Sequence, residues 1–118
     1  RDKDPAELAQ QVDRVLAQYQ IAPESICKIA SIDLKTHERA ICQLAETWKV
    51  PFVTFSAETL LQVPGAYALS EFVKQTTGVG NVCERAAVAA LEEQKRKNPK
   101  WICRKQAGNG VTVALLET

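Results

Sequence analysis

The 118-residue sequence contains no methionine, one histidine and no Cys-x-x-Cys pair. A structural zinc site combines closely spaced cysteines and histidines, so we expect the protein to provide no metal site. No apolar run approaches the roughly 20 residues that a membrane-spanning helix requires, so we expect no membrane partner. The four cysteines all lie within or beside apolar segments: Cys27, Cys42, Cys83 and Cys103. We therefore expect buried free thiols in a reducing compartment, which indicates a cytoplasmic protein.

Several enzyme motifs are also missing. The sequence has no Walker motif, and neither Ser56 nor Ser70 lies in the Gly-x-Ser-x-Gly context of a nucleophilic serine. Gly78 and Gly80 lack a third glycine at the dinucleotide-binding spacing and follow an expected helix instead of a strand. These absences argue against a serine hydrolase and against a dinucleotide-binding fold.

Basic residues are unevenly distributed, although the formal net charge is only +1. Six of the fifteen lie between positions 95 and 105, and no acid occurs between Glu93 and Glu117. This segment either complements a helix dipole or faces an anionic ligand or a neighbouring domain. We expect no nucleic-acid partner, because Trp101 is the only aromatic residue of the segment and the domain is not basic overall.

The apolar pattern predicts a single α/β domain over residues 1–118, with 46% apolar and 25% charged residues. We expect helices at 5–20, 37–48, 57–61 and from 82 to about 97, and strands at 26–32, 50–55, 101–103 and 111–116. Together they predict a three-layer α/β/α sandwich with a small mixed sheet. A turn at 106–110 predicts a C-terminal β-hairpin. Since the chain opens with Arg1 and a helix, we also expect a first strand upstream of it.

The densest polar group follows the first expected strand. It consists of Asp33, Lys35, His37 and Glu38. Ligands of open α/β sheets bind where strands end at their carboxyl edge, so this group is well placed to meet one. Asp33 and His37 could form a general acid–base pair. Alternatively, His37 and Glu38 lie in the exposed first turn of the next helix, where an acid favours the helix dipole.

Helix starts offer a second kind of candidate. Ser56 is placed to cap a short helix, and Ser70 to cap another that ends near Thr76. The Asn81-Val82-Cys83-Glu84 stretch resembles a capping box that opens a longer helix. Free N–H groups at such starts can hold a carboxylate, although capping alone would also account for these residues.

With these elements assigned, the chain resembles the C-terminal domain of cobalt-precorrin-5A hydrolase (CbiG), a family whose stand-alone form is called CobE. The resemblance covers nearly the whole chain and depends on short segments in order: Ser31-Ile32-Asp33-Leu34-Lys35, Phe55-Ser56-Ala57-Glu58-Thr59-Leu60 with Val63-Pro64, Ser70-Glu71, Gly78, Gly80-Asn81-Val82-Cys83-Glu84-Arg85-Ala86-Ala87, Lys105 and Gly110-Val111-Thr112-Val113-Ala114. Two features depart from the family pattern. Only Arg1 could match its opening Gly-x-Gly-Cys-Arg motif, and Gly65-Ala66-Tyr67-Ala68 replaces a segment with more prolines and an asparagine.

The resemblance implies a role in cobalamin biosynthesis. The full hydrolase opens the ring-A lactone of a cobalt-corrinoid precursor and releases acetaldehyde. The substrate would be a precorrin or cobalt-precorrin tetrapyrrole with many carboxylates, and cobalt would arrive within it, so no cofactor is expected. Asp33 or Glu38 would activate water. The expected substrate contacts are Lys35, Ser56, Gly80, Asn81, Lys105 and Thr112. Two other readings stay open: a non-catalytic corrinoid carrier, and an interaction domain that contacts other domains or enzymes of the pathway.

Overall fold

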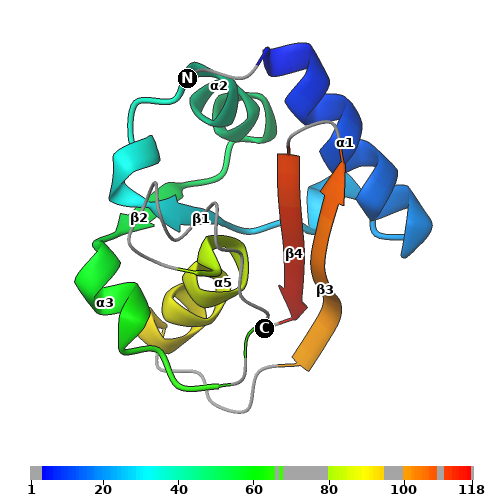
Figure 1. Ribbon diagram of the computed structural model, residues 1–118. Coiled ribbons are helices and arrows are strands. Elements are labelled where there is room, and N and C mark those ends of the chain that lie inside the picture. The colour runs from blue at the N-terminus through cyan, green and yellow to red at the C-terminus, as the bar shows by residue number, and fades with distance from the viewer. Residues whose placement is uncertain (1–3, 66, 68–79, 95–99, 109–110, 118) are drawn as a thin grey trace.

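The computed structural model describes residues 4–65, 67, 80–94, 100–108 and 111–117. Along the chain lie α1 (Pro5–Gln18), η1 (Pro23–Ser25), β1 (Ile29–Ile32), η2 (Asp33–Lys35), α2 (Arg39–Trp48), β2 (Phe52–Phe55), α3 (Ala57–Leu61), α5 (Val82–Glu93), β3 (Lys100–Gly108) and β4 (Val111–Glu117) (Figure 1). The predicted α/β class is confirmed. The short helix expected from Ser70 to Thr76 lies outside the described residues.

The strands form two hydrogen-bonded pairs. β1 and β2 are parallel, with Ile29 opposite Phe52 and Ile32 opposite Phe55. β3 and β4 are antiparallel and form the predicted C-terminal hairpin, with two irregularities in register. Within the described part of the chain, parallel and antiparallel pairing therefore both occur, but each pair is a two-stranded sheet of its own.

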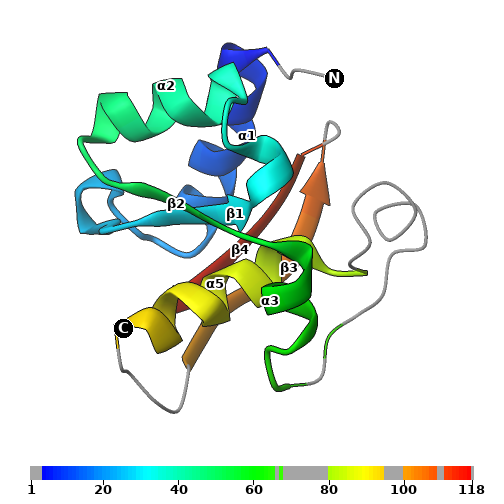
Figure 2. The same cartoon turned by 90° about the vertical axis from the view of Figure 1, so that its left-hand side faces the viewer.

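Helices cover both sides of the strands, which gives the predicted three layers. Figure 2 shows α1 and α2 on one side and α5 with α3 on the other. One core joins Leu8, Val12 and Leu16 of α1 to Ala40 and Val111. The other joins Ile32, Leu60 and Val63 to Ala86, Val88 and Ala89 of α5. Alanines on α5 let that helix approach β1 and β4 closely, because a methyl side chain adds little bulk.

The first helix forms as its sequence predicts. Asp4 caps it by accepting a hydrogen bond from the Ala6 amide at 3.2 Å, and Pro5 occupies the first turn. Val15 and Leu16 are buried on the inner face. The helix ends at Gln18, shortly before Gln20 takes a left-handed φ of 57°. Local signals are therefore sufficient to place α1.

Several boundaries differ from the prediction. The first helix ends at Gln18 instead of residue 20, and the second strand begins at Phe52 instead of residue 50. The first strand begins at Ile29 instead of residue 26. The second helix begins at Arg39 instead of residue 37, because the 3-10 turn η2 continues directly from β1. The strand expected at 101–103 extends to Gly108, since residues expected to form a turn instead pair with β4, such as Gly108 with Val111.

Candidate functional site: the strand-end edge

The carboxyl ends of the parallel strands and the start of α5 lie on one side of the molecule. Figure 2 shows η2, α3 and the first turn of α5 on that side. We call this surface the strand-end edge and define it as residues 33–38, 56–61 and 80–84. Such an edge is the usual ligand position in α/β folds, since strand ends and helix N-termini meet there.

The end of β1 carries Asp33, Lys35 and Glu38, as predicted. The Nζ atom of Lys35 lies 3.2 Å from Oε2 of Glu38, whose side chain is only 11% exposed. Asp33 is exposed. The Thr36 hydroxyl donates to the Asp33 carbonyl at 2.7 Å and lies 3.2 Å from the Thr54 hydroxyl of β2. The turn is therefore held against the neighbouring strand, and this fixes the position of Asp33.

His37 does not pair with Asp33 through any hydrogen bond found among the described residues, and it is exposed. Glu38 is the N-cap residue of α2 but makes no capping hydrogen bond with its side chain. The helix begins at Arg39, two residues later than expected, so the alternative that both residues lie in its first turn is wrong. Glu38 instead faces Lys35.

Ser56 follows β2 and caps α3. Its hydroxyl accepts from the Thr59 amide at 3.1 Å and lies 2.9 Å from the Thr59 hydroxyl. The capping prediction is confirmed. Both contacts are internal to α3, so the structural role accounts for the position of this side chain.

Asn81 caps α5 from a buried position. Its Oδ1 accepts from the Glu84 amide at 3.2 Å, and its Nδ2 donates to Oε1 of Glu84 at 3.1 Å. The residue is 1% exposed. The contact from the Asn81 side chain to the Glu84 amide in the predicted capping box therefore forms, and the Glu84 carboxylate has further partners outside the helix.

Those partners come from β3. Arg104 donates from Nη2 to Oε1 of Glu84 at 2.9 Å and from Nε to Oε2 at 3.1 Å. The Lys105 amide donates to Oε2 at 2.6 Å. The Glu84 side chain is 2% exposed and that of Arg104 is 48% exposed. The carboxylate thus links the first turn of α5 to the middle of β3.

The pKa of Glu84 reflects this environment. Burial alone would raise the pKa, because it disfavours the charged carboxylate. The hydrogen bonds from Arg104, Lys105 and Asn81, together with the charge of Arg104, outweigh burial and lower the pKa below its ordinary value. Glu84 is therefore ionised at neutral pH.

Aromatic rings support the two arginines beside Glu84. The Arg104 guanidinium carbon lies 4.4 Å from the centre of the Trp101 ring and 5.9 Å from that of Tyr67. The corresponding carbon of Arg85 lies 4.6 Å from the Tyr67 ring centre. Nη1 of Arg85 also donates to the Leu60 carbonyl at 3.0 Å, at the end of α3. These distances suit cation–π attraction.

We call this group the Glu84 cluster: Tyr67, Asn81, Glu84, Arg85, Trp101, Arg104 and Lys105. It joins α5 to β3 and to the segment that follows α3. The charge of Lys105 is close enough to lower the pKa of Cys83, in the first turn of α5. Burial outweighs that effect and raises the pKa of the Cys83 thiol to about 12.

The predicted residues thus fall into four places. Asp33, Lys35 and Glu38 meet at the end of β1, while Ser56 caps the helix after β2. Gly80, Asn81 and Lys105 lie around Glu84. Thr112 is an exposed residue of β4, opposite Ala107.

Sequence reasoning did not select Glu84 or Arg104 as site residues. Each had a signal: Glu84 through the capping-box spacing, and Arg104 through the basic segment. Their pairing joins positions 20 residues apart, which no local pattern specifies. Tyr67 and Trp101 gave no signal of a site.

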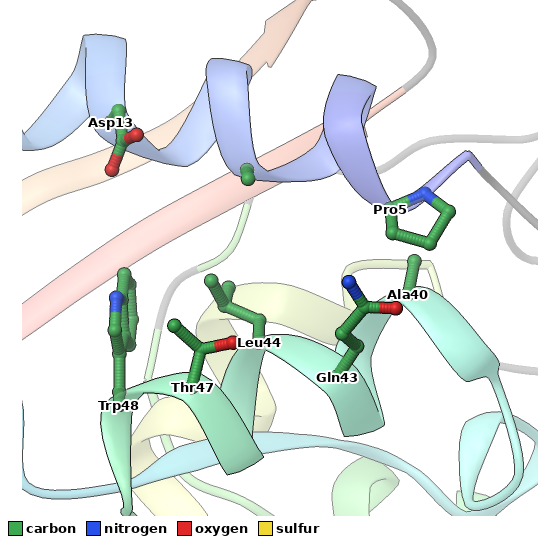
Figure 3. A pocket seen from close by; sticks show the side chains of 8 residues that line it. Pro5, Asp13, Ala40, Gln43, Leu44, Thr47 and Trp48 are labelled. Atoms are coloured by element: carbon green, nitrogen blue, oxygen red, sulfur yellow. The ribbon is translucent and has the colours of Figure 1, made fainter.

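A separate surface groove lies between α1 and α2, away from these residues. It has a volume of about 150 Å³ and is lined by residues that include Pro5, Asp13, Gln43, Leu44 and Trp48 (Figure 3). None of the predicted site residues lines it. The groove and the strand-end edge are therefore two separate surfaces.

Within residues 4–65, 67, 80–94, 100–108 and 111–117, no group of three or more histidine, cysteine or acidic side chains could hold a metal ion. Over the same ranges no helix has the length and apolar character needed to cross a bilayer.

All four cysteines are free thiols, as predicted, but Cys27 and Cys42 are exposed and not buried. The expectation of four buried thiols is wrong for these two, because each lies at the edge of its apolar segment; Cys83 is half-buried and Cys103 is buried.

Comparisons with known proteins agree on one family. The family model described as "Cobalamin synthesis G C-terminus" matches residues 1–116. The chain is 39% identical over 80 residues to the cobalt-precorrin-5A hydrolase of Salmonella typhimurium, a match that covers 68% of the chain and 23% of that protein. It is 35% identical over 91 residues to the probable cobalt-precorrin-5A hydrolase of Methanocaldococcus jannaschii, covering 73% and 28%. The chain thus spans about a quarter of the length of these relatives.

A solved structure shares the fold. The crystal structure of CobE, a protein from the cobalamin (vitamin B12) biosynthetic pathway, aligns with a TM-score of 0.87. The alignment covers 98% of this chain and 85% of that one at 24% sequence identity. At this identity the likeness establishes the three-dimensional arrangement alone.

Proposed function

This chain belongs to the cobalamin synthesis G C-terminal family, and we propose that it binds the carboxylates of a corrinoid precursor as a domain of a cobalt-precorrin-5A hydrolase. Its role lies in cobalamin biosynthesis. The free thiols support action in the cytoplasm.

The observation that carries this proposal is the gathering of cations at or beside the strand-end edge. Lys35 lies at the end of β1, and Arg104 and Lys105 flank the start of α5. A corrinoid precursor of the kind that this family acts on carries many acetate and propionate side chains. Several spaced cations at one edge suit such a ligand better than one deep pocket would, since its charges lie around the periphery of a broad ring.

The same edge offers a residue for hydrolysis. In the proposed reaction, water attacks the carbonyl carbon of the ring-A lactone, and Asp33 accepts the proton that the water loses. The C–O bond between this carbon and the lactone oxygen breaks, and that oxygen takes up a proton. Acetaldehyde release then requires the resulting alcohol to lose this proton and form a C=O bond while its C–C bond to the macrocycle breaks, and the macrocycle carbon takes up a proton. Glu38 is a weaker candidate for the role of Asp33, because its carboxylate faces Lys35 at 3.2 Å. Cobalt belongs to the substrate, and no step requires a metal held by the protein.

A second candidate function is binding without catalysis. It is favoured by the exposure of Asp33, since a side chain open to bulk solvent does not lie in a water-excluding site of the kind that strengthens electrostatic catalysis. In that case the chain would hold the corrinoid for another part of the polypeptide. The exposed Leu34 and Leu61 on the strand-end edge would suit contact with such a neighbouring domain or with another enzyme of the pathway.

Two titrations and one assay separate these functions. The chain is titrated with cobyrinic acid, whose side chains are carboxylates, and with cobinamide, whose side chains are amides, and the visible absorption band of the corrin is followed. We expect saturable binding of cobyrinic acid that weakens in Lys35→Gln and stays unchanged in Arg14→Gln, on the far layer. Failure of the wild-type chain to bind cobyrinic acid would refute the proposal.

Acetaldehyde release from cobalt-precorrin-5A then tests for catalysis. If the chain is catalytic, Asp33→Asn should slow release while leaving cobyrinic acid binding intact. Binding without any release by the wild-type chain would favour the non-catalytic function.

A further inference from the structure

We propose that Arg104, held in place by Glu84, is the residue that binds a carboxylate of the corrinoid. This inference rests on the proposed function and narrows it: among the cations at or beside the strand-end edge, it assigns carboxylate recognition to Arg104, which neither the motifs nor the family resemblance singled out. It also gives Glu84 a role, as the residue that positions Arg104.

The geometry of the ion pair supports this assignment. Two parallel contacts, from Nη2 at 2.9 Å and Nε at 3.1 Å, fix the plane of the Arg104 guanidinium against the Glu84 carboxylate. Glu84 is itself fixed by Asn81 and by the Lys105 amide, at 3.1 and 2.6 Å. The orientation of the arginine is thus determined by backbone and buried groups, not by solvent.

The exposure of Arg104 is the second argument. A side chain that is 48% exposed usually samples many rotamers, and a ligand must then restrict them on binding. Here the rotamer is restricted beforehand by Glu84 and by the Trp101 ring at 4.4 Å. A guanidinium that is ordered in advance and still reaches solvent is suited to recognise a carboxylate.

The Glu84 cluster contains more positive than negative charges. Within the Glu84 cluster, Arg85, Arg104 and Lys105 supply three positive charges, and Glu84 supplies one negative charge. The Glu84 carboxylate is buried while the Arg104 side chain is 48% exposed, so the charged group of this pair that reaches solvent is the positive one. A carboxylate is preferred over a neutral amide at such a surface.

Trp101 provides a local reporter for the test. The sequence contains two tryptophans, and the other, Trp48, lies in the groove between α1 and α2. In a Trp48→Phe background, Trp101 is the one remaining tryptophan. Its ring centre lies 4.4 Å from the Arg104 guanidinium carbon, so its fluorescence reports ligand binding at Arg104. The probes are cobyrinic acid, cobinamide, and citrate as a small tricarboxylate, all at constant ionic strength.

In this background we compare Arg104→Gln, Arg104→Lys and Arg14→Gln. Arg104→Gln should weaken cobyrinic acid binding roughly 10- to 100-fold, the effect of losing one charge-assisted hydrogen bond. Arg104→Lys keeps the charge and an ion pair with Glu84, so it should fold and bind with an intermediate affinity. Arg14→Gln should match the parent. Circular dichroism verifies folding in each case.

The outcomes separate this inference from the proposed function. Parent-like binding of cobyrinic acid by both Arg104 variants would overturn the inference and leave the proposed function standing. Citrate binding that depends on Arg104, without cobyrinic acid binding, would support the anion site and overturn the corrinoid function. Absence of binding by either acid would overturn both.

Discussion

Replacing Glu84 by alanine should destabilise the domain by about 2–5 kcal/mol. The substitution removes the acceptor for the Asn81 side chain, which is 1% exposed, and for the Lys105 amide. Loss of a buried hydrogen-bonding partner costs about 1–3 kcal/mol. Arg104 adds little to this sum, because its half-exposed side chain can be solvated by water.

Urea denaturation followed by far-UV circular dichroism measures this loss. The unfolding midpoint should fall while the slope m stays constant, since the surface exposed on unfolding hardly changes. Glu93→Ala is the matched control, on the same helix. Its carboxylate is 55% exposed and lies 3.9 Å from Lys28, so the loss should stay within about 0.5 kcal/mol. Equal losses in the two variants would contradict the assigned role of the Glu84 carboxylate.

The pH dependence gives an independent test. The pKa of Glu84 is lowered in the folded state, so ionisation stabilises the fold above the unfolded-state pKa of about 4.3. That stabilisation is lost as the pH falls through the folded-state pKa. The difference in unfolding free energy between wild type and Glu84→Gln should therefore be largest near neutral pH and shrink below about pH 4. A difference that does not vary with pH would refute the ionised state.

Three further outcomes follow from local contacts. Cys83, whose pKa is raised to about 12 by burial, should resist iodoacetamide at pH 8 while the exposed Cys42 is alkylated, as read by peptide mass spectrometry. Ser56→Ala should cost about 1 kcal/mol of unfolding free energy through loss of the α3 cap, and an unchanged urea midpoint would argue against capping. Gly108→Ala should lower the thermal midpoint, because its Cβ would lie 2.8 Å from both polar atoms of the Gln11 side chain, which is 3% exposed; a midpoint equal to that of wild type would show that Gln11 can move aside.

Elements with local signals were predicted well. α1 is specified by the Asp4 cap, Pro5 and an apolar stripe, and the structure follows all three. Ser56 and Asn81 cap the helices that they were expected to cap. The strand-end position of Asp33 and Lys35 was also predicted correctly, because it depends only on where an apolar run stops.

Features that depend on distant pairing were not predicted. β3 continues to Gly108 because β4 supplies hydrogen-bond partners. The amino-acid composition of residues 106–110 does not indicate this pairing. The capping-box pattern fixed the place of Glu84 but not its partner. A glutamate at that position can return to the helix or reach across to a strand, and the choice depends on Arg104 being brought close by the fold.

The Glu84–Arg104 pair should affect binding and stability by separable amounts. An ion pair with a buried partner often contributes no more stability than a neutral pair of similar volume, because the buried charge, here that of Glu84, must be desolvated. Replacing both residues by glutamine keeps an acceptor at position 84 and a donor at position 104. This double variant should therefore lose less stability than Glu84→Ala in the urea assay.

The same double variant should lose cobyrinic acid binding as fully as Arg104→Gln does, because the positive group is gone. Retained binding in the double variant would mean that neutral hydrogen bonding at position 104 is sufficient for recognition. Stability reduced as far as in Glu84→Ala would mean that the charges themselves hold α5 against β3. The expected result, a stable fold that no longer binds, assigns the charge of this pair to ligand recognition, since hydrogen bonding alone would already account for the packing.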